Sequence, residues 1–325
     1  MTDSMTDSMT DSMTDSMINT VVRIGTRSSE LALRQARLVA AQLAERGVAS
    51  ELITYTTIGD RILDRPLNAI GEKGLFTAEL EADLVAGRTD CAVHSLKDLP
   101  TADPEGLSII ALLEREDPRD ALVTGPGVTA RSLHELPHGA RVGTSSLRRR
   151  AQLRALRPDF EVLELRGNVG TRLRKIDEGQ VDAALLAAAG LNRLGLNDRI
   201  VALLDPPLWL SAPGQGAIAV QARANDAHMT AILRTLDHAP TRCAITAERS
   251  LLAALEGGCQ VPIGAAMMHG AEGAILHGVI ASVDGTQVVR GSMLVDLANP
   301  EVAGRALARH LHEHGGAHIL AALRS

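Results

Sequence analysis

Apolar and polar positions follow one another along the chain in a rhythm of short strands and longer helices. The stretch 29–46 has the apolar spacing of a helix, with Ser29 available as N-cap, Glu30 in the first turn and Gly47 as the stop. The first unit has predicted strands at 21–25, 51–57 and 91–94 and predicted helices at 29–46 and 75–86. Because strands and helices alternate, we expect an α/β domain with a largely parallel sheet.

A second unit repeats this rhythm and a third departs from it. The second unit has predicted strands at 141–143, 160–165 and 182–187 and predicted helices at 146–157 and 169–178. Pro206, Pro207 and Pro213 then indicate a crossing between units, with a strand predicted at 216–221. The last part combines a helix at 246–255, glycine-rich strands with an Asp284-Gly285 hairpin signal, and a helix at 301–314. This mixture predicts a small α+β domain.

These patterns divide the chain into four segments. Residues 1–16 are four copies of Met-Thr-Asp-Ser, which have no apolar face to bury, so we expect a disordered repeat tail. We assign 17–115 with 216–236 to α/β domain 1, 116–215 to α/β domain 2, and 237–325 to α+β domain 3.

Composition excludes several classes of function. The net charge is −6, which gives no basic field for nucleic acid, and the four aromatic residues leave few surfaces for base stacking. No apolar run is long enough to span a bilayer, and the N-terminus lacks the pattern of a secretory signal. The spacing of the three cysteines fits neither a disulfide framework nor a zinc site. We therefore expect a cytoplasmic protein without nucleic-acid partners, membrane partners or a metal.

The two α/β units share a local motif. Ile24-Gly-Thr-Arg-Ser-Ser29 and Val142-Gly-Thr-Ser-Ser-Leu147 each place Gly-Thr between a strand and a helix, where N–H groups, hydroxyls and the positive helix end can converge on an anion. Ordinary N-capping by serine explains either motif alone. Two such motifs at matching places, each near arginine, favour two lobes that close on an anionic ligand.

Arginines cluster near the second motif. Arginine binds carboxylates through two parallel hydrogen bonds and keeps its charge, so several arginines at strand ends suit a ligand with many carboxylates. We expect this role for Arg148, Arg149 and Arg166. A solvated basic face is the preferred interpretation for Arg150, Arg154 and Arg157.

Two further motifs carry candidate chemistry. His94-Ser-Leu-Lys-Asp98 follows a buried strand, where Lys97 and Asp98 can form a tuned acid–base pair and His94 is expected to be structural. Glu256-Gly-Gly-Cys259 exposes a sulfur on an uncrowded loop, so Cys259 is the best candidate for a reactive thiol. Cys91, in an apolar strand, and Cys243, at a predicted helix start, are expected to be structural.

Read in order, the motifs of this chain closely resemble those of the porphobilinogen deaminase (hydroxymethylbilane synthase) family from about residue 21 to the C-terminus. The motifs are Ile24-Gly-Thr-Arg27, Gly71-Glu-Lys-Gly-Leu-Phe76, Val93-His-Ser-Leu-Lys-Asp98, Glu114-Arg-Glu-Asp-Pro-Arg-Asp120, Gly143-Thr-Ser-Ser-Leu-Arg-Arg149, Leu165-Arg-Gly-Asn-Val-Gly-Thr-Arg172, Ala189-Gly-Leu-Asn-Arg-Leu194, Gly214-Gln-Gly216 and Glu256-Gly-Gly-Cys-Gln-Val-Pro-Ile-Gly264. The resemblance implies two α/β lobes like those of periplasmic binding proteins, plus a small α+β C-terminal domain.

The resemblance also implies residue roles. Cys259 would hold a dipyrromethane primer through a thioether, and Asp98 would be the catalytic carboxylate. Primer binding would fall to Ser95, Lys97, Thr144, Ser146, Arg148, Arg149 and Arg166, and substrate binding to Arg27, Ser29, Gln35 and Arg193. The implied reaction joins four porphobilinogen molecules with loss of ammonia, then releases hydroxymethylbilane by hydrolysis, in a monomer. The alternative is a non-catalytic, two-lobed anion-binding receptor, which shares the fold but leaves Gly-Gly-Cys259 unexplained.

Overall fold

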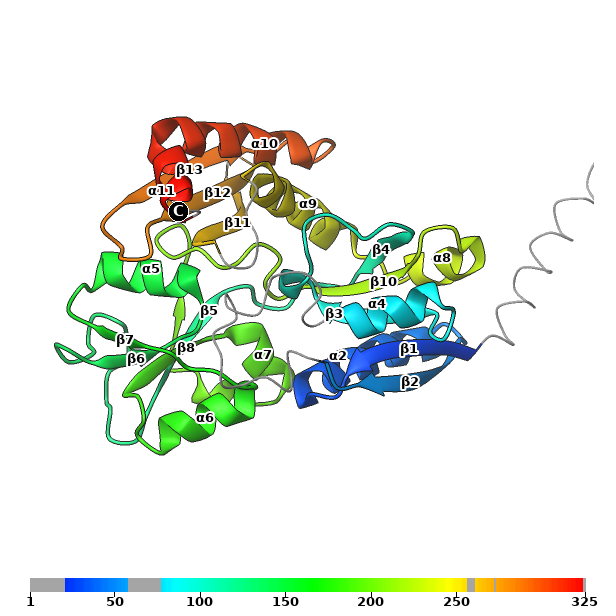
Figure 1. Ribbon diagram of the computed structural model, residues 1–325, viewed down its shortest axis with the longest axis horizontal. Helices are drawn as coiled ribbons and strands as arrows, with labels where there is room; N and C mark the ends of the chain where they lie inside the picture. The colour runs from blue at the N-terminus through cyan, green and yellow to red at the C-terminus, as the bar shows by residue number, and fades with distance from the viewer. Residues whose placement is uncertain (1–20, 58–76, 256–260, 272, 324–325) are drawn as a thin grey trace, which may run out of the picture.

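The computed structural model describes residues 21–57, 77–255, 261–271 and 273–323. Figure 1 shows three bodies: a lobe with blue, cyan and yellow-green elements on the right, a green lobe at lower left, and an orange and red domain above the green lobe. The expected tail at 1–16 and Cys259 lie outside the described residues, so both remain predictions. The expected class, two α/β lobes with a small α+β domain, is confirmed.

The first lobe is built on a five-stranded sheet with the order β2-β1-β3-β10-β4. Its strands are β1 (Val21–Arg27), β2 (Ala49–Tyr55), β3 (Cys91–Ser95), β4 (Leu107–Leu112) and β10 (Ile218–Arg223). β1 pairs in parallel with β2 and β3, whereas β10 is antiparallel to β3 and β4. Only β10 therefore runs against the others, which confirms a largely parallel sheet.

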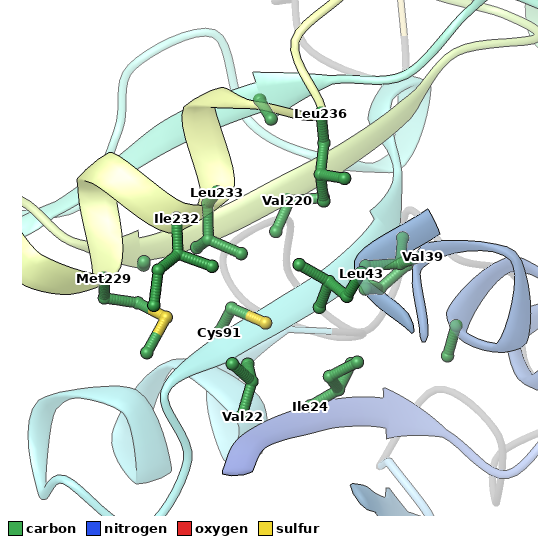
Figure 2. Close-up of a cluster of buried hydrophobic side chains, with 14 of the residues drawn as sticks. Val22, Ile24, Val39, Leu43, Cys91, Val220, Met229, Ile232, Leu233 and Leu236 are labelled. Atoms are coloured by element: carbon green, nitrogen blue, oxygen red, sulfur yellow. The ribbon is translucent and has the colours of Figure 1, made fainter. Parts of the chain in front are cut away.

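In the part of the chain that the structure describes, this sheet is accompanied by the helices α2 (Glu30–Ala44), α4 (Ala78–Val85) and α8 (Ala227–Arg234). α2 begins where the sequence predicts, with Ser29 as N-cap. Its Val39 and Leu43 pack against Val22, Ile24 and other aliphatic side chains of one buried cluster (Figure 2). The Cys91 thiol lies inside this cluster, where burial raises its pKa, in agreement with the expected structural role.

The second lobe repeats the topology of the first with the strand order β7-β6-β8-β5-β9. Its strands are β5 (Asp120–Thr124), β6 (Arg141–Gly143), β7 (Glu161–Leu163), β8 (Ala183–Ala187) and β9 (Ala202–Leu204). Its helices are α5 (Leu147–Leu156), α6 (Val169–Asp177) and α7 (Ala188–Arg193). Here β5 is the reversed strand, antiparallel to β8 and β9.

The third domain is an antiparallel sheet with helices against it. β11 (Ile263–Gly270), β12 (Gly273–Ala281) and β13 (Val288–Leu294) pair in chain order, with α9 (Ala239–Ala254), α10 (Pro300–Leu311) and α11 (Ala317–Ala322) alongside. Gly285 has a φ of 76° in the turn between β12 and β13, which confirms the predicted hairpin. α9 starts seven residues before the predicted position, at Ala239 with a proline in its first turn, so Cys243 lies within the helix rather than at its start.

Candidate active site

The turn after β1 forms one wall of a cavity in the first lobe. Ser29 Oγ accepts a hydrogen bond from the N–H of Ala32 at 3.4 Å, and Thr26 Oγ1 donates to the Ala32 carbonyl at 3.2 Å. Both bonds fix the first turn of α2 against the strand end. Arg27 and Ser29 consequently face the cavity from a firmly held turn.

The end of β3 forms the opposite wall. The cavity brings together five residues that the sequence assigned to the site: Arg27, Ser29, Gln35, Ser95 and Asp98. Gln35 Nε2 donates to Ser95 Oγ at 2.9 Å, which ties α2 to the end of β3. Lys97 and Asp98 follow in a short 3₁₀ helix, Leu96–Asp98.

Lys97 is a half-buried cation close to charges from both lobes. Its Nζ donates to Gln215 Oε1 at 3.4 Å. Burial lowers the pKa of Lys97 to about 8; Asp98 and Asp120 oppose this effect, whereas Arg149 and Arg148 add to it. The Lys97 amine can therefore change its protonation state near neutral pH.

His94 lines the same cavity and is uncharged at neutral pH. Burial lowers the pKa of His94 to about 4, although a contact with the side chain of Gln221 counters part of this effect. Its Nε2 is buried and meets no hydrogen-bond partner among the described residues. The ring is thus a neutral part of the wall behind Asp98.

In the second lobe, Arg148 and Arg149 converge on one carboxylate, that of Asp120. Arg148 Nη1 donates to Asp120 Oδ2 at 2.6 Å, and Arg149 Nη2 donates to Asp120 Oδ1 at 2.7 Å. All three side chains are buried. Burial alone would raise the pKa of Asp120, but the two guanidinium charges outweigh it and hold this pKa well below its usual range.

Asp120 therefore serves as an internal anion for the arginine pair, and the sequence reasoning missed it. Trp209 Nε1 and Gln215 Nε2 also donate to its carboxylate, at 2.7 and 2.8 Å. The available signal was a single acid directly before the apolar run Ala121–Val123, a place where an unpaired charge would be costly.

The second Gly-Thr turn holds its polar groups as the first one does. Ser146 caps α5 by accepting from the N–H of Arg149 at 3.5 Å, and Thr144 Oγ1 accepts from the N–H of Ser146 at 3.2 Å. Ordinary N-capping thus operates in both motifs, alongside any anion that the turns bind.

Three arginine nitrogens near this turn are buried without a hydrogen-bond partner among the described residues, Nε of Arg148, Nε of Arg150 and Nη1 of Arg166. Arg172, near the start of α6, is a further cation here. Burial and the charge of Arg149 lower its pKa to about 10, and Asp98 of the first lobe opposes part of this effect. Arg172 therefore lies within electrostatic reach of both lobes, although the sequence reasoning gave it no role.

Arg193 lies away from this group, at the crossing between the lobes. Its Nη2 donates to the carbonyl of Gly216 at 2.6 Å, and burial lowers its pKa. The three arginines expected on a solvated face each have a protein partner: Arg150 with Glu164, Arg154 with the Val283 carbonyl, and Arg157 with Asp159.

A dipyrromethane with acetate and propionate groups fits this arrangement. The buried, unsatisfied nitrogens of Arg148 and Arg166 are donors that carboxylates can satisfy, and Arg172 and Lys97 add positive charge. The predicted attachment residue, Cys259, lies outside the described residues. Among the helices of the described residues, none is long and apolar enough to cross a membrane.

Comparisons with known proteins agree on one family. Residues 22–231 match the family model described as "Porphobilinogen deaminase, dipyromethane cofactor binding domain", and residues 242–313 match "Porphobilinogen deaminase, C-terminal domain". A porphobilinogen deaminase of Roseiflexus castenholzii is 52% identical over 300 residues, which is 92% of this chain and 98% of the relative. One of Desulforudis audaxviator is 50% identical over 306 residues, 94% of this chain and 98% of the relative.

Solved structures give weaker likenesses. The Bordetella pertussis BvgS periplasmic VFT2 domain covers 70% of this chain and 91% of its own, at 17% identity and a TM-score of 0.41. The methionine-binding protein MetQ covers 66% of this chain and 89% of its own, at 13% identity and a TM-score of 0.43. The sequence relatives cover nearly the whole chain and are about half identical to it, so this protein belongs to the porphobilinogen deaminase family.

Proposed function

We propose that this chain carries out the reaction of its family with Asp98 as the catalytic carboxylate. Porphobilinogen deaminase joins four porphobilinogen molecules with loss of ammonia and releases hydroxymethylbilane by hydrolysis. The observation that carries the proposal is the cavity in which Asp98 lies with Arg27 and Ser29. Arg27 can bind a substrate carboxylate there, while Asp98 faces the pyrrole.

The roles follow from charge. As ammonia leaves, the substrate pyrrole becomes cationic, and the Asp98 carboxylate can stabilise that charge and accept or return a proton. Ser29, Gln35 and Arg193 complete the proposed substrate contacts.

The remaining site residues are proposed to hold the dipyrromethane. When bound, this group supplies the nucleophilic pyrrole carbon at which the chain grows. Its carboxylates would be held by the cations and hydroxyls between the lobes, namely Ser95, Lys97, Thr144, Ser146, Arg148, Arg149 and Arg166. Because Arg148 and Arg149 are already positioned by Asp120, their binding geometry is preorganised.

Asp98 is tested by Asp98→Asn, which keeps the shape and removes the charge. We expect single-turnover product formation on protein that carries the dipyrromethane to slow by about 100- to 1000-fold. Asp98→Glu, which misplaces the charge by one methylene, should fall between Asn and the parent protein. Asp103→Asn, at an exposed acid in the loop that follows, is the matched control and should be unaffected. Turnover of Asp98→Asn within threefold of the parent rate would rule out this role.

Cys259 is tested by intact mass. Cys259→Ala should lack the extra covalent mass of a dipyrromethane and should be inactive. Cys91→Ala and Cys243→Ala should retain the covalent mass and the activity. Full loading of Cys259→Ala would end the assignment.

The arginines separate into two classes in the same assay. Arg149→Leu should load the dipyrromethane poorly, whereas Arg27→Leu should load it and fail in substrate addition. Normal loading and turnover in both variants would reduce these arginines to structural residues.

We further propose a monomer that acts in the cytoplasm on the small molecule porphobilinogen. Light scattering coupled to gel filtration tests it, and a stable dimer would contradict it.

A further inference from the structure

The tripeptide Gly214-Gln215-Gly216, in the segment that returns from the second lobe to the first, has a side chain without an assigned role. Gly214 and Gly216 have φ angles of 77° and 87°. A Cβ on Gly216 would lie 2.4 Å from the Glu116 carbonyl oxygen, so only glycine fits there. Gln215, between them, is completely buried. Its backbone is thus closely constrained, and the side chain has a defined direction.

The Gln215 amide connects the two lobes through both of its ends. Its Nε2 donates to Asp120 Oδ1 at 2.8 Å and to the Pro118 carbonyl at 2.7 Å. Its Oε1 accepts from Lys97 Nζ at 3.4 Å. One neutral side chain therefore lies between Lys97 of the first lobe and the Asp120 carboxylate, which holds Arg148 and Arg149 in the second.

The third domain holds the same tripeptide from behind. Glu248, which is completely buried, accepts from the N–H of Gly214 at 2.9 Å and from both terminal nitrogens of Arg115, at 2.7 and 2.9 Å. Arg115 Nε donates to the backbone carbonyl oxygen of Gln215 at 2.8 Å. Residues of all three domains thus hold Gln215 in place. A side chain that orients a neighbouring cation must itself be held in this way.

We propose that Gln215 is a positioning residue, which holds the Lys97 ammonium at a set place relative to the Asp120–Arg148–Arg149 cluster. The proposal rests on the proposed role of Lys97 in the pocket. Four charged groups act on Lys97: Asp98 and Asp120 raise its pKa, and Arg149 and Arg148 lower it. The side chain of Gln215 adds a neutral acceptor to these groups. The negative end of the Gln215 carbonyl dipole stabilises the charged form of the amine.

The protonation of Lys97 is the readout, since a purely structural role of Gln215 would leave it unchanged. The chain has only three lysines, Lys73, Lys97 and Lys175, so ¹³C-lysine labelling of the full-length, dipyrromethane-loaded protein gives three Cε signals to titrate by NMR. Lys73→Arg and Lys175→Arg assign them. The pKa of Lys97 in the parent protein is the reference value for the variants.

Two substitutions should affect this pKa differently. Gln215→Met has a similar length but no acceptor, so the pKa of Lys97 should fall by about half to one pH unit. Gln215→Glu keeps an acceptor toward Lys97, and its second oxygen, which replaces Nε2 beside Asp120 and the Pro118 carbonyl, should carry a proton, so the pKa of Lys97 should not fall. Both variants disturb the Nε2 contacts, so a common loss of stability cannot lower this pKa in only one of them. If Gln215→Met does not fold, Gln215→Asn, which is too short to reach Lys97, should give the same fall.

Asn192→Ala is the matched control. It removes the hydrogen bond from Asn192 Nδ2 to Glu116 Oε1 at the same crossing, 3.1 Å long, without contacting Lys97, and should leave the pKa of Lys97 unchanged. A pKa of Lys97 that stays at the parent value in Gln215→Met and Gln215→Asn, or that shifts equally in Asn192→Ala, overturns the proposal. The NMR result does not depend on turnover, so it is separate from any failure of Asp98 or Lys97 in the activity assays.

Discussion

The two α/β lobes are built alike, and their likeness extends to single residues. β1 in the first sheet and β6 in the second each lie between two parallel neighbours, followed by one reversed strand and an edge strand. Arg23 of β1 pairs with Asp90 at 2.7 Å, and Arg141 of β6 pairs with Asp182 at 2.6 Å, in both cases near the beginning of the strand. At the other end of the same strands lie the two Gly-Thr turns. The scaffold is thus repeated almost unchanged.

The lobes differ where the reversed strand begins. In the first lobe Ile218 pairs with Ser95, the last residue of β3, and in the second lobe Asp120 pairs with Ala187, the last residue of β8. Isoleucine and aspartate therefore occupy equivalent positions. The aspartate gives the second lobe an internal partner for its arginines, whereas in the first lobe Arg27 and Asp98 line a cavity. At the equivalent place the second lobe therefore has a buried charged cluster, whereas the first has an apolar side chain.

The largest effect is expected from removing the residue that makes the difference, in Asp120→Ala. Arg148 and Arg149 would remain buried without their carboxylate, which typically costs about 3–5 kcal/mol of unfolding free energy. Urea unfolding measures it. Asp205→Ala removes an acid of the same lobe that is 71% exposed and pairs with Arg119, so it should cost less than about 1 kcal/mol. Equal losses in the two variants would contradict the view of Asp120 as a central partner.

Much of the fold was predictable because it depends on local patterns. The helix caps at Ser29 and Ser146 and the turn at Gly285 follow from short-range chemistry, and the structure confirms all three. β5 was missed because only its pairing with β8 and β9, which are distant in sequence, makes Asp120 the first residue of a strand. The sequence could place the arginines near the second turn, but their partner is 28 and 29 residues away and reaches them only through that pairing.

The next effect concerns pH and the buried histidine of the first lobe. His94 occupies the place of Leu186 in the second lobe, one residue before the strand end. Its pKa is about 4 when folded, against 6.5 for a free histidine, so between these values the unfolded chain binds a proton that the folded chain does not. Stability should therefore decrease as the pH falls from 6.5 to about 4, by roughly 2–3 kcal/mol. Urea unfolding at pH 7 and at about pH 4.5 measures the decrease.

His94→Gln supplies the control for this pH effect. Glutamine does not titrate, so the variant should lack the contribution of His94 to the decrease in unfolding free energy. The contribution of the acids should remain. Asp120 behaves differently, because its pKa is lowered in the folded state and its contribution is lost only at still lower pH. A His94→Gln protein with the parent's full pH dependence would assign the decrease to other groups.

A smaller effect distinguishes two arginines of one helix in the second lobe. Arg172 of α6 is within electrostatic reach of Asp98, whereas Arg174 forms an exposed pair with Glu178. We expect Arg172→Leu to weaken carboxylate binding by about 10- to 100-fold, measured as the KM for porphobilinogen or as loss of dipyrromethane by intact mass. Arg174→Leu should leave both values unchanged. Similar behaviour of the two variants would mean that Arg172 does not face the ligand.

Arg172 also shows what limits prediction of the site. Arg166 lies in the connection before α6 and Arg172 lies within the helix, but a solvated helix face has the same pattern, as Arg174 shows. The charge of Asp98, from a segment distant in sequence, distinguishes Arg172 from Arg174. Gln215 is a similar case, because nothing in Gly214-Gln215-Gly216 indicates that its amide meets Lys97, which is 118 residues earlier in the chain.

The smallest effect tests the likeness of the lobes rather than their difference. Asp90→Ala and Asp182→Ala remove equivalent acids, each of which binds the N–H and the guanidinium of its arginine, Arg23 or Arg141. Both pairs are partly solvent-exposed, so each loss should be about 1 kcal/mol. Asp90→Ala should cost slightly more, because Arg223 adds a second cation at 3.7 Å. The acids lie in separate sheets without a shared partner, so the double variant should show the sum in urea unfolding. If the double variant loses much less unfolding free energy than the sum of the two single losses, the lobes do not unfold as a single unit. The two equivalent pairs would then report on two separate stabilities.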